Sequence, residues 1–86
     1  MGRAATISLS KKEFEILHFL MAKSGHMVTH TQLLQKIWGD EYGKQDADLL
    51  YRTIDRLRRK LSEKSKTGWQ IKAERGVGYT FLVNGD

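Results

Sequence analysis

The chain has 86 residues, 40% of them hydrophobic, and contains neither cysteine nor proline. This length supports one small core, so we expect residues 1–86 to form a single domain. The lack of cysteine excludes a disulfide framework and a thiolate zinc site, and it suits the reducing cytoplasm. No apolar run approaches the ~18 residues of a membrane-spanning helix, so no membrane partner is expected.

The net charge of +5 is concentrated in one part of the chain. Residues 1–51 hold six Lys or Arg and six Asp or Glu, whereas residues 52–86 hold nine basic and four acidic residues. A basic excess confined to part of a small domain is typical of polyanion binders, with nucleic acid favoured over a membrane surface. We therefore expect nucleic-acid contacts from the second part.

The first part predicts a short strand and two helices. Residues 6–9 alternate polar and apolar side chains, as a strand does. Capping boxes, formed by Ser10 with Glu13 and by Thr29 with Gln32, predict helices over about residues 11–23 and from residue 29 to Gly39. The predicted apolar face of the first helix comprises Phe14, Ile16, Leu17, Leu20 and Met21.

Residues 39–48 contain two glycines and four acids without apolar periodicity, which predicts a loop. Asp46 or Asp48 can cap a third helix over about residues 47–62. Its core-facing residues recur at spacings of four, three and four, at Leu50, Ile54, Leu57 and Leu61. At 100° per residue its opposite side carries Arg52, Arg56 and Arg59.

The C-terminal part predicts a β-hairpin with a basic tip. Residues 69–74 and 79–83 alternate apolar and polar side chains, and the bend between them holds Arg75, Gly76 and Gly78. Three helices, the third with an arginine face, followed by such a hairpin indicate an α+β winged helix-turn-helix. A helix of ~10–12 Å diameter fits the major groove of DNA, and the planar fork of arginine suits guanine and phosphate.

Four motifs occur in order: LSKKEFEIL at residues 9–17, VT, LL and IWG within residues 28–39, RLRRKL at 56–61, and RGVGY at 75–79. Together they resemble the OmpR/PhoB-type DNA-binding domain of bacterial response regulators, over about residues 6–83. The resemblance implies a recognition helix in the major groove and a wing, about residues 75–79, in the minor groove. It also implies direct-repeat promoter sites bound by a tandem dimer, RNA polymerase as a partner, and a receiver domain and sensor kinase in a phosphorelay.

The resemblance carries over to individual residues. Arg56 takes the position of a base-reading arginine, and Arg75 that of the wing arginine. Thr53, Arg58 and Tyr79 match positions that touch phosphate, and Trp38 matches a backbone contact. The complete expected set comprises Tyr51, Arg52, Thr53, Asp55, Arg56, Arg58 and Arg59 on the recognition helix, Arg75, Gly76 and Tyr79 in the wing, and Thr29 and Trp38 at the DNA backbone.

The loop between the second and third helices faces RNA polymerase in this family, which makes Asp40, Glu41 and Asp46 the expected contacts. Tyr51 and Asp55 depart from the family pattern, so the operator sequence does not transfer from relatives. Most of the family's N-terminal four-stranded sheet is absent, with residues 6–9 as a remnant. The chain is therefore either an excised effector domain without its receiver or a short natural regulator.

Two other functions remain open at this stage: a winged-helix protein-interaction module, and a nonspecific basic nucleic-acid binder. The arginine face argues against the first. The three histidines have no cysteine partners, so no metal site is expected. Since no phosphate loop or nucleophile elbow occurs, we expect no cofactor and no enzymatic activity.

Overall fold

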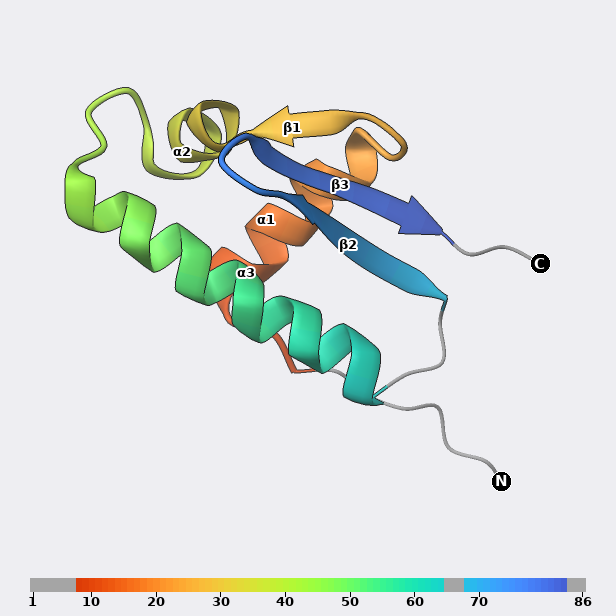
Figure 1. Cartoon of the computed structure of the whole chain (residues 1–86). Helices are drawn as coiled ribbons and strands as arrows, with labels where there is room; N and C mark the ends of the chain where they lie inside the picture. The colour runs from red at the N-terminus through yellow and green to blue at the C-terminus, as the bar shows by residue number, and fades with distance from the viewer. Residues whose placement is uncertain (1–7, 65–67, 84–86) are drawn as a thin grey trace.

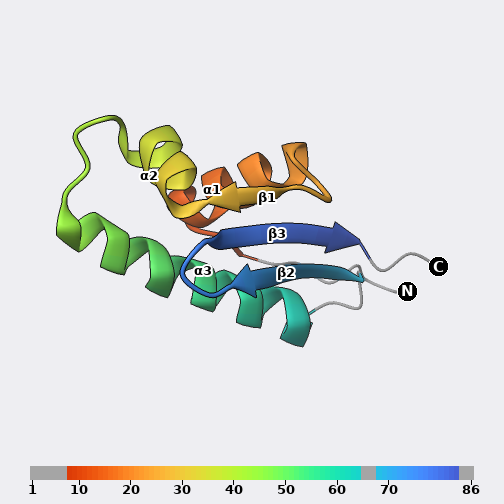
Figure 2. The ribbon, with the colours of Figure 1, turned by 45° about the horizontal axis from the view of Figure 1, so that its top comes forward.

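The computed structural model describes residues 8–64 and 68–83. The elements follow in the order α1 (Lys11–Ala22), β1 (Met27–Thr29), α2 (His30–Trp38), α3 (Lys44–Lys64), β2 (Trp69–Glu74) and β3 (Gly78–Val83). The helices pack together, and the sheet covers one side of them, with α1 behind β3 and α3 alongside β2 (Figures 1 and 2). This arrangement is the predicted three-helix core with a C-terminal hairpin.

Both predicted capping boxes are present. The Ser10 amide donates to Glu13 Oε1 (2.8 Å) and the Glu13 amide donates to Ser10 Oγ (3.2 Å). The same reciprocal pair joins Thr29 and Gln32 at the start of α2, at 2.8 and 3.1 Å. At the other end of α2, Gly39 adopts φ of 94°, a conformation that favours glycine and stops the helix.

The third helix begins earlier than predicted. It starts at Lys44, so the loop is confined to residues 39–43, and Asp46 and Asp48 both lie within the helix. Asp46 still satisfies a backbone donor at this helix start, because its Oδ2 accepts from the Gly43 amide at 2.7 Å. Its position in the first turn also places a negative charge at the positive end of the helix dipole.

The three strands form one antiparallel sheet in the order β1-β3-β2. The hairpin prediction is confirmed: β2 pairs with β3 from Trp69 opposite Val83 to Glu74 opposite Gly78. The pairing of β1 with β3 was not predicted. Of the strand predicted at residues 6–9, residues 6 and 7 lie outside the described part, and residues 8 and 9 are not in a strand.

The core differs from the predicted apolar face of α1 at two positions. Phe14 is 58% exposed and Met21 38% exposed, whereas Glu13 is buried. A helix packed on one side can bury only part of a wide apolar face, and Glu13 shares its buried stripe with residues three, four and seven positions later. The buried apolar core comprises Ile16, Leu17, Leu20, Val28, Leu33, Leu34, Leu50, Ile54, Leu57, Leu61, Ile71, Tyr79 and Phe81.

Candidate nucleic-acid interface

The outward side of α3 carries the basic residues that the sequence predicted there. The four leucine and isoleucine residues of the predicted stripe are at most 3% exposed. Four arginines of the same helix are exposed: Arg52, Arg56, Arg58 and Arg59. Arg59 Nη2 lies 3.1 Å from Asp55 Oδ2 in a solvent-exposed pair, which orients Arg59 but stabilises the fold little.

Thr53 does not lie on that outward side. It is 4% exposed, and its hydroxyl donates to the Leu49 carbonyl oxygen at 2.6 Å. The expectation that Thr53 touches phosphate is therefore not supported by its position. Thr53 lies three residues after Leu50 and four before Leu57, so helical spacing alone already places it beside the buried stripe.

The wing is the turn between β2 and β3. The Val77 amide donates to the Glu74 carbonyl oxygen at 2.9 Å, and Gly76 adopts φ of 76°, which closes the turn and leaves Arg75 exposed at its tip. Tyr79, in contrast, is only 8% exposed. Burial raises the pKa of its hydroxyl, and nearby Tyr51 raises it further, so Tyr79 is a neutral hydroxyl at pH 7.

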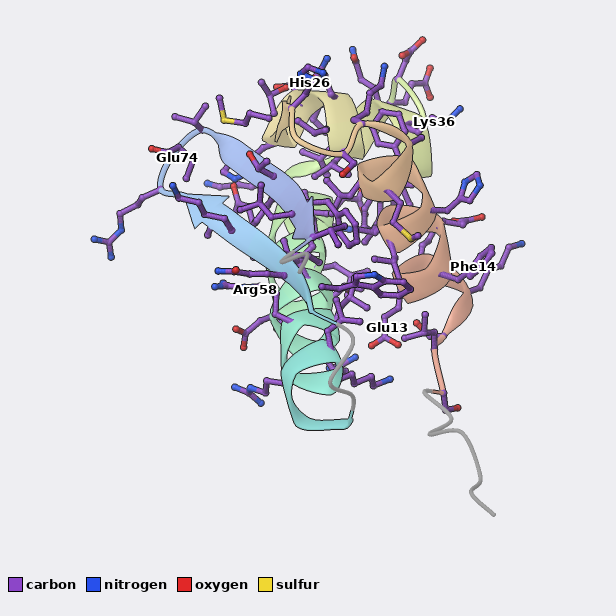
Figure 3. All side chains as sticks on the ribbon, turned by 90° about the vertical axis from the view of Figure 1, so that its right-hand side faces the viewer. Glu13, Phe14, His26, Lys36, Arg58 and Glu74 are labelled. Carbon is purple, nitrogen blue, oxygen red and sulfur yellow. The ribbon has the colours of Figure 1, made fainter. Side chains whose placement is uncertain are left out.

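Arg58 of α3 and the wing lie on the same side of the molecule. In Figure 3, Arg58 of α3 points to the side of the molecule on which Glu74 marks the end of β2, whereas Phe14 of α1 points to the opposite side. An open cleft of about 320 Å³ separates α3 from β2, with Arg58 and Arg59 on its helical wall. Two cationic side chains and the Asp55 carboxylate therefore line the α3 side of this cleft.

The two expected backbone contacts have different surroundings. Thr29 is the N-cap of α2, where its Oγ1 accepts from the Gln32 amide. Trp38, at the other end of α2, is half-buried against the core, and Lys12 Nζ lies 4.9 Å from its ring centroid. Packing and a cation–π contact thus account for Trp38 without DNA.

The three acids of the expected polymerase surface are divided between two elements. Asp40 and Glu41 are exposed in the loop at residues 39–43, whereas Asp46 belongs to α3 and accepts from the Gly43 amide. Figure 1 shows this loop at the end of the molecule opposite to the start of β2. The acidic side chains of this loop are therefore Asp40 and Glu41.

An ion pair between buried Glu13 and partly exposed Lys60, which was not predicted from the sequence, ties the C-terminal half of α3 to α1. Lys60 Nζ donates to Glu13 Oε1 at 2.7 Å and to the Ser8 carbonyl oxygen at 2.8 Å, and Glu13 is 1% exposed. Burial raises the pKa of Glu13, but the bonds from Lys60 and the Ser10 amide, with the charges of Lys60 and Arg56, lower it below its usual value.

In residues 8–64 and 68–83, no group of three or more His, Cys, Asp or Glu side chains is arranged to hold a metal ion. Within the same ranges, no helix has both the length and the apolar composition to cross a bilayer.

Comparison with known proteins identifies the family. The family described as transcriptional regulatory protein, C terminal, matches residues 4–81. The chain belongs to this family. It is similar to the response regulator SaeR of Staphylococcus aureus (strain USA300), with 37% identity over 70 residues, which are 81% of this chain and 30% of SaeR. The chain thus spans less than a third of the length of that relative.

Solved structures of other members share the fold. The DNA binding domain of Escherichia coli CpxR has a TM-score of 0.73 and 31% identity, covering 93% of this chain and 78% of that one. The Klebsiella pneumoniae RstA DNA-binding domain, solved in complex with the RstA box, has a TM-score of 0.68 and 29% identity, covering 88% and 74%. The predicted α+β winged-helix fold and the OmpR/PhoB resemblance are thereby confirmed.

Proposed function

We propose that this chain binds double-stranded DNA in a sequence-specific manner, as the effector domain of a two-component transcription regulator in the bacterial cytoplasm. The observation that carries the proposal is the set of exposed arginines on α3, of which Arg58 points to the side of the molecule where β2 ends at the wing. The complex of the related RstA domain with its DNA box supports it.

In the proposed complex, α3 lies in the major groove and the wing reaches the adjacent minor groove. Arg56, with Arg52 and Asp55, reads base edges, because arginine pairs with guanine and a carboxylate accepts from cytosine. Arg75 suits a narrow minor groove. Arg58 and Arg59, which line the cleft between α3 and β2 beside Asp55, would contact the intervening phosphates.

Membership of the family supports four further partners. A receiver domain and a sensor kinase would control the effector domain, and a tandem dimer would occupy direct-repeat promoter sites. The exposed acids Asp40 and Glu41 lie in the loop that the family presents to RNA polymerase, so we assign polymerase contact to them.

The proposal is tested by selecting sites from random duplexes with this chain and measuring affinity for the selected site. Arg56→Ala should weaken binding to that site by about 1–3 kcal/mol and relax one base position. Lys11→Ala removes an exposed charge from α1 and serves as the matched control, with affinity near that of the wild type. Equal losses on selected and random duplexes would reassign Arg56 to phosphate.

The salt dependence of the same affinity separates the alternatives. Five to eight phosphate contacts correspond to a log–log slope of about −4 to −7. A steep slope without any selected sequence would identify a nonspecific binder. No binding to duplex DNA at low salt would instead support a protein-interaction module.

A further inference from the structure

Three elements meet at His30, the first residue of α2. Its amide donates to the Val77 carbonyl oxygen in the wing turn at 3.1 Å. Its ring centroid lies 5.1 Å from that of Tyr51 on α3 and 5.4 Å from that of Tyr79 on β3, with interplanar angles of 63° and 54°. These edge-on and tilted arrangements are the favourable ones for aromatic rings.

Tyr51 and Tyr79 differ in burial and in the element to which they belong. Tyr79 is 8% exposed and is paired on both sides, opposite Val28 and Ala73, so its ring is held by the sheet. Tyr51 is 41% exposed and lies on α3, one turn before Asp55. The His30 ring therefore joins a ring that belongs to the wing strand to one that belongs to the exposed side of α3.

Further along the exposed side, the surface between the hairpin and α3 is open. There, from Asp55 to Arg59, the open cleft of about 320 Å³ lies between the helix and β2. The core beneath holds the two elements together, but their outward sides meet at the rings. A small change at His30 would therefore alter the angle between the wing and the outward side of α3.

We propose that His30 is a positioning residue that couples the wing to the recognition helix, so that the two engage adjacent grooves as one rigid unit. The coupling rests on the proposed DNA binding, but the geometry that produces it belongs to the free protein. His30 acts through its ring, wedged between Tyr51 and Tyr79, and through its amide on Val77.

A double-mutant cycle with the wing tip tests the coupling. Affinity for the selected duplex is measured for the wild type, His30→Ala, Arg75→Ala and the double variant. We expect His30→Ala to weaken binding about threefold to tenfold and to make the further loss from Arg75→Ala much smaller than in the wild type. Losses that simply multiply in the double variant would overturn the proposal.

A conservative variant separates positioning from direct contact. His30→Phe keeps an aromatic ring between the tyrosines, so its affinity should stay within about twofold of the wild type, with the full effect of Arg75→Ala retained. If His30→Phe binds as weakly as His30→Ala, the imidazole nitrogens themselves matter and the proposal fails. His26→Ala, at an exposed histidine before β1, is the matched control.

Residual dipolar couplings of backbone amides in the free chain provide a readout without DNA. His30→Ala should change or average the orientation of the hairpin relative to α3, whereas His30→Phe and His26→Ala should preserve it. An unchanged orientation in His30→Ala would overturn the proposal. Absence of DNA binding by the wild type would contradict the proposed function instead, and the dipolar couplings would still decide the role of His30.

Discussion

Glu13 shows how one charged residue can be buried without being isolated. Burying a carboxylate costs roughly several kcal/mol of hydration free energy unless a charged partner and hydrogen bonds offset this cost. Here Oε1 accepts from Lys60 Nζ and from the Ser10 amide, so the same oxygen caps α1 and ties α1 to α3. Its Oε2 is buried and has no hydrogen-bond partner among the residues that the structure describes. Apart from the capping bond, the stabilisation of the buried Glu13 carboxylate therefore depends on the charge of Lys60.

Glu13→Gln should lower the free energy of unfolding by about 1–3 kcal/mol at pH 7. This loss is smaller than that for breaking a fully buried ion pair because the Lys60 side chain is 31% exposed. The amide can keep the capping box but cannot pair with the Lys60 ammonium. Urea unfolding of Glu13→Gln measures the difference, with Glu15→Gln as control because Glu15 is half-exposed and lies 3.9 Å from its partner Lys12. Equal stabilities for the two variants would contradict the role assigned to the pair.

The lowered pKa of Glu13 also predicts a pH dependence. The folded state binds this proton more weakly than the unfolded chain, so the stabilisation is complete above the ordinary value of 4.5 and is lost as pH falls through the lower folded-state value. Unfolding at a series of pH values from neutral down to acid should show the difference between wild type and Glu13→Gln shrinking below pH 4.5. A difference that stays constant would exclude this linkage.

The burial of a single residue was predictable where helical spacing alone determines it. Helical periodicity places both Glu13 and Thr53 beside buried stripes, but Glu13 was predicted only as part of a capping box and Thr53 as a phosphate contact. The burial of each depends on a partner oxygen or amine in the fold. The partner Lys60 lies 47 residues from Glu13 along the chain. No local pattern in the sequence links the two positions.

At the scale of elements, the sequence predicts what local chemistry controls. Capping boxes mark the starts of α1 and α2, and alternation marks the hairpin. The start of α3 was misplaced because several residues of the stretch 39–48 are good helix-start residues. The bonds between Gly43 and Asp46 mark the actual start, and they are visible only in the structure. Three residues of β1 are too few to show a period.

Gly78 is where β3 passes closest to β1. A Cβ at this position would overlap the Val28 carbonyl oxygen and press on Thr29 Cα, both of them backbone atoms that cannot rotate away. Gly78→Ala should therefore lower the free energy of unfolding by about 1–3 kcal/mol, as overpacking does. Chemical denaturation measures it, with Gly43→Ala as control because a Cβ there meets only Asp46 Oδ2 at 3.9 Å. Similar stabilities would show that the strands can separate at little cost.

Across the whole molecule, the described arginines and the acidic side chains of the loop lie on different elements. The net positive charge comes from residues 52–86, and the described arginines among them lie on α3 and the wing, whereas Asp40 and Glu41 lie in the loop between α2 and α3. A basic surface attracts DNA, whereas the phosphates repel acidic side chains. This separation permits simultaneous contact with DNA and with a second macromolecule.

Charge reversal in the loop tests this separation. The double variant Asp40→Lys, Glu41→Lys should reduce transcription by RNA polymerase from a promoter that carries the selected site, while affinity for the site stays equal or rises slightly because positive charge is added. Transcription assays in vitro, paired with binding measurements, provide the readout, and Glu15→Lys on α1 is the control. Reduced DNA affinity in the loop variant would contradict the division of roles.

The pairing of β1 with β3 also has a consequence for the order of folding. Glu74 and Gly78 are close in the chain, so the hairpin closes a short loop, whereas Met27 and Thr80 are brought together across the whole of α2, α3 and β2. Long loops cost more entropy to close and slow the formation of such contacts. We expect β1 to dock last, so the junction of His30, Tyr51 and Tyr79 is completed in the final stage of folding.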